Sequence, residues 1–195
     1  MRAFRTARLL KNRLPAAPVL AVPALALAAA AAALLASPAP VAAQAVIETD
    51  TAKIFEQRWM QSKEADKNGL LMYLDEQRAL TGDYLSIRCE EGARSVRLGF
   101  GTARPQLAGG QAEAQFIIDG QATTYRLGYT GTTPDPAISQ GDIHGYRMLF
   151  ASASERDGFL AALQRGSELR IEGQALPISL AGSGQAISEQ AGYCR

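Results

Sequence analysis

The sequence is poor in the residues that build metal centres and redox sites. It contains two cysteines and one histidine, Cys89, Cys194 and His144. This set excludes zinc sites with four Cys or Cys and His ligands, iron–sulfur clusters and centres with several histidine ligands. The chain also has no run of alternating oxygen ligands around a glycine, as a calcium loop requires. We therefore expect neither a metal ion nor a cofactor.

The sequence also lacks the common hydrolase motifs. It has no Gly-x-Ser-x-Gly nucleophile elbow, and Gly182-Ser183-Gly184 is too short to form one. His144 lies at the start of a predicted strand, where it is expected to be an exposed or half-exposed loop residue, or a ligand-contacting group beside Tyr146. A hydrolase could instead use two pairs of acids, although their pattern is that of ordinary turn residues: Glu90, Glu91, Asp135 and Asp142.

Charge is nearly balanced over the whole chain but not within it. The chain has 20 Lys and Arg against 19 Asp and Glu, a formal charge of +1. Residues 1–43 contain five basic residues and no acidic one, which leaves 15 basic and 19 acidic residues, a balance of −4, in the remainder. The basic residues of the remainder are dispersed, and no aromatic run alternates with them. We expect no binding to nucleic acid.

The first 45 residues have the order of a secretory signal. Residues 1–13 are basic, Val19–Ala36 is an alanine-rich apolar run, and Ser37-Pro38-Ala39-Pro40 ends any helix. Small residues at positions −3 and −1 then predict cleavage after Ala43 or Ala45. The alternative is an uncleaved anchor, because the apolar run approaches the length of a membrane span.

Export would place residues 46–195 in the periplasm of a Gram-negative cell, with no stable membrane insertion after cleavage. In an oxidising compartment, an isolated pair of cysteines is expected to be bridged. Cys89 and Cys194 therefore predict one structural disulfide. The alternative is a redox pair, which usually has closely spaced cysteines.

Alternating apolar residues predict many short strands after Tyr84. Glu91-Gly92, Asp119-Gly120 and Glu172-Gly173 are the predicted turns between them. The expected strands are Leu85–Cys89, Val96–Phe100, Ala114–Asp119, Gln121–Leu127, Tyr146–Phe150, Leu169–Ile171 and Ala175–Leu180.

Two helices are predicted near the C-terminus. The first begins with Ser154 as N-cap and ends at Gly166, and the second covers Gln185–Gln190. Gly128–Gly141, with its glycines and prolines, is predicted as a surface loop.

The segment before Tyr84 has two interpretations. The Asn-Gly pair in Asp66-Lys67-Asn68-Gly69 predicts a hairpin between Lys53–Ser62 and Leu70–Glu76. The alternative is a helix from Asp50 or Thr51 to Trp59, because that stretch is rich in helix-forming residues. Together the predicted elements indicate a mainly β (α+β) chain. We expect a single antiparallel β-sandwich-like or barrel-like domain with one or two short helices.

Five polar or aromatic residues are candidates for a ligand or partner surface. They lie on or near the predicted strands at 121–127 and 146–150, and the alternative is that they are ordinary strand residues. The candidates are Tyr125, Arg126, Tyr129, His144 and Tyr146. Trp59, the single tryptophan, is expected in the core.

Short signatures along the chain carry a family resemblance. They are Trp59-x-x-Ser62, Leu85-x-Ile87-Arg88-Cys89, Ile118-Asp119, Phe159-Leu160-x-x-Leu163, Leu169-x-Ile171, Ser179-Leu180-x-Gly182-x-x-Gln185-Ala186-Ile187 and Cys194. In these signatures the chain resembles the VasI/TagO-like small periplasmic proteins associated with type VI secretion, and also the invasion-associated locus B proteins. The resemblance implies a disulfide-tied β-sandwich without a cofactor, and an accessory or binding role in the envelope. It supplies no catalytic residues.

The expected function is that of a non-enzymatic periplasmic binding protein or an accessory of secretion or the envelope. Its expected partner is an envelope or secretion-system protein, or a cell-wall polymer, bound through a sheet face or through residues 128–145. The alternatives are an acid-dependent envelope hydrolase and a virulence factor like the locus B proteins.

Overall fold

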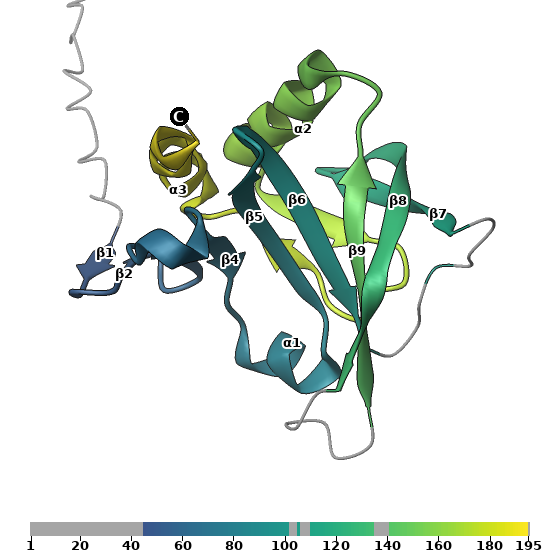
Figure 1. The fold of residues 1–195 in the computed structure, drawn as a ribbon, viewed down its shortest axis with the longest axis horizontal. Helices are drawn as coiled ribbons and strands as arrows, with labels where there is room; N and C mark the ends of the chain where they lie inside the picture. Colours follow the sequence, from purple (N-terminus) through teal and green to yellow (C-terminus); the bar gives the residue numbers. More distant parts are fainter. Residues whose placement is uncertain (1–44, 102–104, 106–109, 135–140, 195) are drawn as a thin grey trace, which may run out of the picture. The chain divides into compact units, whose positions relative to one another are not determined.

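The computed structural model describes residues 45–101, 105, 110–134 and 141–194 of the protein. Short strands dominate this part of the chain (Figure 1), and three α-helices and two 3-10 turns lie between and after them. The elements are β1 (Val46–Glu48), β2 (Ala52–Phe55), β3 (Trp59–Ser62), η1 (Ala65–Lys67), β4 (Leu71–Tyr73), α1 (Glu76–Thr81), β5 (Tyr84–Glu90), β6 (Ala93–Phe100), β7 (Gln111–Ile118), β8 (Gln121–Pro134), β9 (Asp142–Leu149), α2 (Ala153–Arg165), β10 (Glu168–Ile171), β11 (Ile178–Ser179), α3 (Ser183–Gln190) and η2 (Ala191–Tyr193).

The strands form one antiparallel sheet in the order β1-β2-β3-β4-β5-β6-β9-β8-β7-β10-β11. The sheet curls, so that β10 and β11 lie behind β5 and β6 in Figure 1. Trp59 on β3 donates from its indole Nε1 to the carbonyl of Ser179 on β11 at 3.3 Å, which joins the two sides of the curled sheet. The prediction of a mainly β, antiparallel domain is confirmed.

The core lies on the inner, concave face of this sheet. Leu85 and Ile87 of β5 lie opposite Leu98 and Val96 of β6, and all four side chains are fully buried. This is the alternation that the sequence predicts for a sheet with one buried face. Two helices close the core with the buried side chains Phe159, Leu160, Leu163, Ala186 and Ile187.

The helices begin and end at recognisable capping residues. The predicted N-cap of α2, Ser154, is wrong, because Ser152 caps the helix by accepting a hydrogen bond from the Glu155 main-chain N–H at 3.1 Å. The Glu155 carboxylate accepts from the N–H of Ala151, the residue before the N-cap, so the arrangement resembles a capping box and begins two residues earlier than expected. The helix ends at Gly166, as predicted. α2 and α3 contact each other through a hydrogen bond from Gln164 to Ser188.

The segment 50–59 is two strands rather than a helix, so the helical alternative is wrong. β2 and β3 are joined by a tight turn in which Glu56 and Gln57 have positive φ angles of 48° and 56°. The turn allows Phe55 and Trp59 to be fully buried side by side across the hairpin. Tertiary packing of these two aromatic rings outweighs local helix propensity. The predicted hairpin around Asn68-Gly69 is present as β3 and β4. Its predicted first arm, Lys53–Ser62, is divided by the turn at Glu56-Gln57, so only Trp59–Ser62 pairs with β4.

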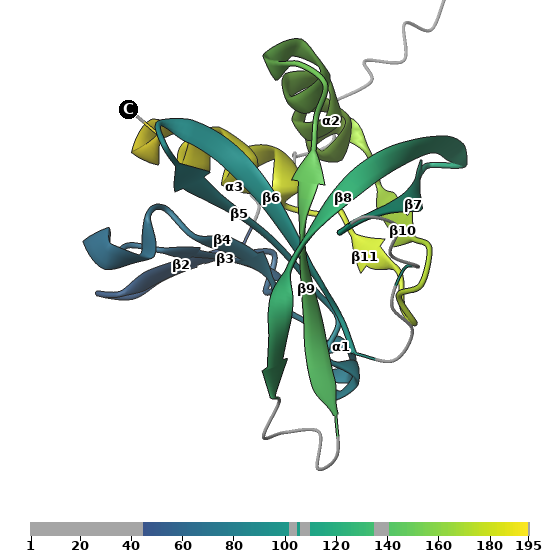
Figure 2. The same ribbon diagram turned by 45° about the vertical axis from the view of Figure 1, so that its right-hand side comes forward.

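The prediction of a loop over Gly128–Gly141 is wrong for its first half. Residues 128–134 continue β8 and pair with β9 as far as Pro134 opposite Asp142, while 135–140 lie outside the described residues. These last pairs form a two-stranded arm that extends beyond the rest of the sheet (Figure 2). The β8 residues of this arm are mostly exposed, so they lack the apolar alternation that identifies a half-buried strand.

The C-terminal part differs from prediction at one strand. The expected strand Ala175–Leu180 is limited to Ile178–Ser179, because the Ala175 N–H donates instead to the Asp83 carboxylate at 2.8 Å. Cys89 and Cys194 form the predicted disulfide, which holds the end of the chain against β5. Within the described residues, no helix combines the length and the apolar character needed to cross a bilayer.

Candidate functional site

Three of the five candidate surface residues meet at the base of the β8–β9 arm. Tyr129 lies opposite Tyr146 with ring centroids 5.4 Å apart, and Thr132 lies opposite His144. The Thr132 hydroxyl contacts His144 Nδ1 at 3.0 Å and also forms a hydrogen bond with the Tyr129 hydroxyl. Tyr129 and Thr132 are three residues apart and would point to opposite faces of a regular strand. The register shift between Tyr129 and Gly131 brings them to the same face.

This small cluster is partly a core feature. Tyr146 is fully buried, packs edge to face on Phe100 at 5.4 Å and donates its hydroxyl to the Pro105 carbonyl at 3.4 Å. His144 is half-buried, and its hydrogen-bond partner among the described residues is a threonine rather than a carboxylate. A histidine that acts as a general base is usually oriented by an acid on its second nitrogen. The arrangement suits a polar contact surface better than a catalytic dyad.

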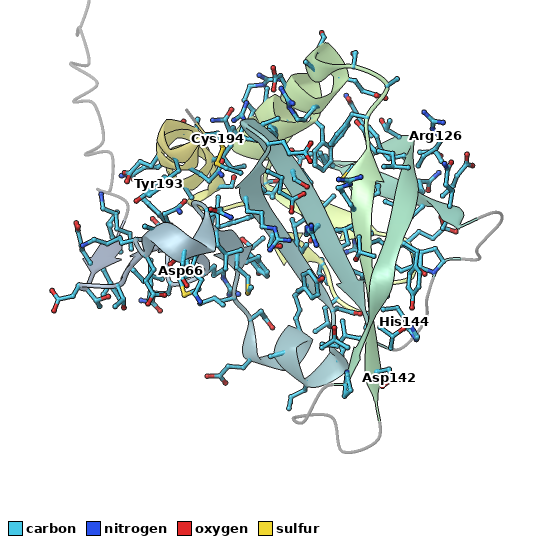
Figure 3. All side chains as sticks on the ribbon, in the orientation of Figure 1. Asp66, Arg126, Asp142, His144, Tyr193 and Cys194 are labelled. Atoms are coloured by element: carbon cyan, nitrogen blue, oxygen red, sulfur yellow. A yellow bond between two sulfur atoms is a disulfide. The ribbon has the colours of Figure 1, made fainter. Side chains whose placement is uncertain are left out.

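The other two candidates lie elsewhere. Tyr125 belongs to an aromatic cluster under α2, with ring centroids 5.4 Å from Phe116, 5.2 Å from Phe159 and 5.7 Å from Phe150. Arg126, the next residue along β8, is exposed and lies far from His144 in Figure 3. The five residues therefore do not form one surface.

The structure brings together a different set of residues, which sequence reasoning missed. Arg88 on β5, Arg97 on β6 and Arg147 on β9 converge on the carboxylate of Glu90. Their nitrogen atoms lie 2.6, 2.5 and 4.0 Å from its oxygens. We call these three arginines with Glu90 the arginine cluster. It lies on the outer, convex face of the sheet, where Arg88, Glu90, Arg97 and Arg147 alternate with core residues along their strands.

The arginine cluster carries more positive charge than its own carboxylate neutralises. Arg97 and Arg147 are direct cross-strand partners. Like charges in such a pair are destabilising. One glutamate serves three guanidinium groups, and Arg147, with half of its side chain exposed, makes only the longest of the three contacts. A domain with an acidic overall balance thus concentrates cations on one face, which suits an anionic partner.

Glu90 is held in its ionised form. Partial burial raises the pKa of its carboxyl group, but the neighbouring Ser95, Arg88 and Arg97 outweigh that effect and place the pKa below the usual 4.5. A general acid must be protonated near neutral pH, so this environment is the opposite of the one that a glycosidase acid needs. Of the other candidate acids, Glu91 lies in an exposed turn, Asp142 is exposed at the start of β9, and Asp135 lies outside the described residues.

Next to the cluster, two facing glycines leave room for an aromatic ring on the sheet. Gly99 of β6 lies directly opposite Gly145 of β9. A Cβ at Gly99 would lie 2.2 Å from ring atoms of Tyr84, so the Tyr84 ring occupies the space over this residue. Burial raises the pKa of Tyr84, although Arg97 and Arg88 oppose the shift. The ring therefore stays neutral and packs beside the arginines.

A hollow of about 400 Å³ opens where β6 and β9 separate. The two strands pair only from Arg97 and Arg147 to Phe100 and His144, and beyond Arg97 they diverge toward α2 (Figure 1). The hollow is lined by both strands and by the first residues of α2: Glu90, Glu91, Ala93, Arg94, Ser95, Arg147, Met148, Leu149, Phe150, Ser152, Ala153 and Arg156. It adjoins the arginine cluster through Glu90 and Arg147.

Two further arginines line this hollow. Arg94 of β6 and Arg156 of α2 both contact one oxygen of Asp157, each at 3.1 Å. These two contacts lower the pKa of the Asp157 carboxyl group, chiefly through the hydrogen bond from Arg156. Five arginines on four elements therefore share the carboxylates of Glu90 and Asp157, with Glu91 at the rim.

Comparison with protein families, curated proteins and solved structures finds no match to the chain. Among the described residues, no group of three or more His, Cys, Asp or Glu side chains could hold a metal ion. The charged groups that the structure brings together at the site are the five arginines with Glu90 and Asp157. The sequence signal for Arg88, Arg97 and Arg147 is weak, since each occupies an outward position of an alternating strand, as many surface residues do.

Proposed function

We propose that the chain is a non-enzymatic binding protein of the periplasm, exported by its N-terminal segment, that serves secretion or envelope assembly. It contacts an envelope or secretion-system protein, or a cell-wall polymer, through the arginine cluster. The observation that carries the proposal is the convergence of Arg88, Arg97 and Arg147 on the single carboxylate of Glu90. An unneutralised cationic face on an acidic domain favours an anionic partner and speeds its association.

The geometry at the acids and the histidine supports binding rather than catalysis. Glu90 is ionised within ion pairs, and His144 contacts a threonine hydroxyl. The cluster also lies on central strands, since β5 pairs with β6 along its whole length and β6 pairs with β9 from Arg97 to Phe100, which makes a rigid platform for side-chain recognition.

The test uses full-length protein expressed in a Gram-negative host and recovered from the periplasm. Binding to separated membrane, peptidoglycan and soluble periplasmic fractions is measured at increasing salt. We expect saturable binding to one fraction that weakens with salt and is lost in the Arg97→Gln, Arg147→Gln double variant. The matched control is Arg126→Gln, Arg170→Gln, which removes two exposed arginines from other strands.

Equal binding by both double variants would show that the arginine cluster is not the binding surface. Hydrolysis of peptidoglycan by the purified protein would contradict the non-enzymatic part of it.

A further inference from the structure

We infer that the hollow between β6, β9 and α2 is a binding site for a phosphate group carried on an envelope glycan. The inference rests on the proposed function and names the chemical group that the arginines of the hollow would bind. Arg94, Arg147 and Arg156 reach the hollow from three different elements and line it together.

The arrangement of these arginines favours phosphate over carboxylate. A phosphate group offers at least two anionic oxygens and a further acceptor, so guanidinium groups on three sides can each find a partner. A carboxylate has two oxygens in one plane. The two carboxylates of the site show that one carboxylate cannot pair closely with all of these guanidinium groups. Asp157 uses one oxygen for both Arg94 and Arg156. Glu90 lies 4.0 Å from the guanidinium of Arg147.

The guanidinium groups, not the helix terminus, carry this assignment. The first turn of α2 is already capped, since Ser152 accepts from the Glu155 N–H and the Glu155 carboxylate accepts from the Ala151 N–H. The hollow is also of the size that holds small ligands, which is about 300–1,000 Å³.

The surroundings favour a glycan rather than a lipid as the carrier. The larger apolar residues that line the hollow, Met148, Leu149 and Phe150, are buried or half-buried. None of the large hydrophobic side chains exposed within the described residues lines it: Val46, Ile47, Leu80 and Tyr193. A lipid head group would bring an acyl region that needs an apolar surface beside the site. A phosphorylated sugar needs only hydrogen-bonding groups, which Ser152 and the arginines of the hollow offer.

Titration of the periplasmic protein with glucose 6-phosphate, glucose and glucuronate tests the site at low salt. We expect saturable binding of glucose 6-phosphate, weaker binding of glucuronate and none of glucose. Arg147→Gln and Arg156→Gln should each weaken binding by about tenfold, the scale of one lost charged hydrogen bond, and the exposed control Arg170→Gln should leave it unchanged. Circular dichroism confirms that each variant is folded.

The Glu90→Gln variant should change the affinity in the direction opposite to that of the arginine variants. This substitution removes the carboxylate that competes for Arg147, so the affinity for glucose 6-phosphate should rise several-fold. A purely structural role for the arginines does not predict that gain. An unchanged or lower affinity in a folded Glu90→Gln variant would count against the site.

Three results would overturn the inference: no saturable binding of glucose 6-phosphate, tighter binding of a polyglutamate peptide, or tighter binding of phosphatidylglycerol vesicles. If one of them occurs while binding to an envelope fraction still depends on Arg97 and Arg147, the phosphate assignment fails and the proposed function stands. If the sugar phosphate binds but no envelope fraction does, the proposed function fails and the site remains.

Discussion

Cys89 on β5 and Cys194, beyond α3, are joined by a disulfide across a sequence separation of 105 residues, with their Cα atoms 5.2 Å apart. The buried Gln190 side chain places its Nε2 3.6 and 3.5 Å from the two sulfur atoms and donates to the Gly69 carbonyl at 3.2 Å. The disulfide therefore fastens the end of the chain to β5, and Gln190 fastens it to the connection between β3 and β4.

Loss of this disulfide should destabilise the domain strongly. The Cys89→Ser, Cys194→Ser double variant is expected to lose about 2–5 kcal/mol of unfolding free energy, because the unfolded chain regains the freedom of a long loop. Urea unfolding of the variant and of the oxidised wild-type protein measures the difference. The wild-type protein under reducing conditions should match the variant, and a loss below about 1 kcal/mol would contradict a structural role.

Acid should weaken the arginine cluster in a way that depends on Glu90. Its pKa in the folded protein lies below the usual 4.5. Its stabilising contribution is therefore complete above pH 4.5 and is lost as the pH falls through the folded-state pKa. Glu90→Gln should lower stability by about 1–3 kcal/mol at pH 7 and flatten the fall in stability below pH 4.5. Urea unfolding at several pH values checks this, and parallel curves for the two proteins would disprove it.

Arg78 should be essential to the joint between β5–β6 and the β10–β11 connection. It is 2% exposed, and its guanidinium donates to the Leu176 carbonyl and to Gln174 Oε1. Gln174 in turn donates to the carbonyls of Tyr84 and Gly99 at 3.1 and 2.8 Å.

Arg78→Met should cost about 2–4 kcal/mol, because it leaves two acceptors without their charged donor. Thermal and urea unfolding give the value. The control Arg170→Met, at a side chain that is 63% exposed, should stay within about 0.5 kcal/mol of the wild-type protein. Similar effects of the two substitutions would mean that Arg78 does not hold the joint.

Two glycines should respond in opposite directions to alanine. Gly158 lies within α2 and has open space where a Cβ would be added, so Gly158→Ala should raise stability by about 0.5–1 kcal/mol through helix propensity. A Cβ at Gly101 would lie 1.9 Å from the Thr81 carbonyl oxygen. Gly101→Ala should therefore destabilise by about 1–3 kcal/mol. Calorimetric melting of both variants tests the pair. Shifts of the same sign in melting temperature would contradict the difference in space around the two glycines.

Export should leave Gln44 as the first residue. Cleavage after Ala43 keeps the Ala45 carbonyl, which accepts from the Glu56 N–H at 2.9 Å, and the Ala45 N–H, which donates to the Glu56 carboxylate at 3.2 Å. Cleavage after Ala45 removes both. Intact-mass measurement of periplasmic protein distinguishes the two forms, and an unprocessed mass would support the membrane anchor instead.

Local patterns in the sequence were sufficient for most of the sheet. Period-two alternation identified β5, β6, β7 and β9, because one face of each strand is buried and the other is not. Turn residues that accept positive φ located the connections, as at Asp119-Gly120, with φ angles of 48° and 83°. The extension of β8 over residues 128–134 escaped prediction because these residues are mostly exposed, so their pattern carries no apolar period.

The candidate site was beyond sequence reasoning for a different reason. Arg88, Arg97 and Arg147 lie on three strands. Their charges meet only because β9 pairs directly with β6, although β7 and β8 lie between these two strands in the sequence. The sequence by itself determined the strand pattern, the acidic balance of residues 44–195 and the two cysteines available for a disulfide, since these depend on composition and short-range periodicity. Only the tertiary structure decided which outward-facing charges become neighbours, because strand order and register are set by packing of the whole core.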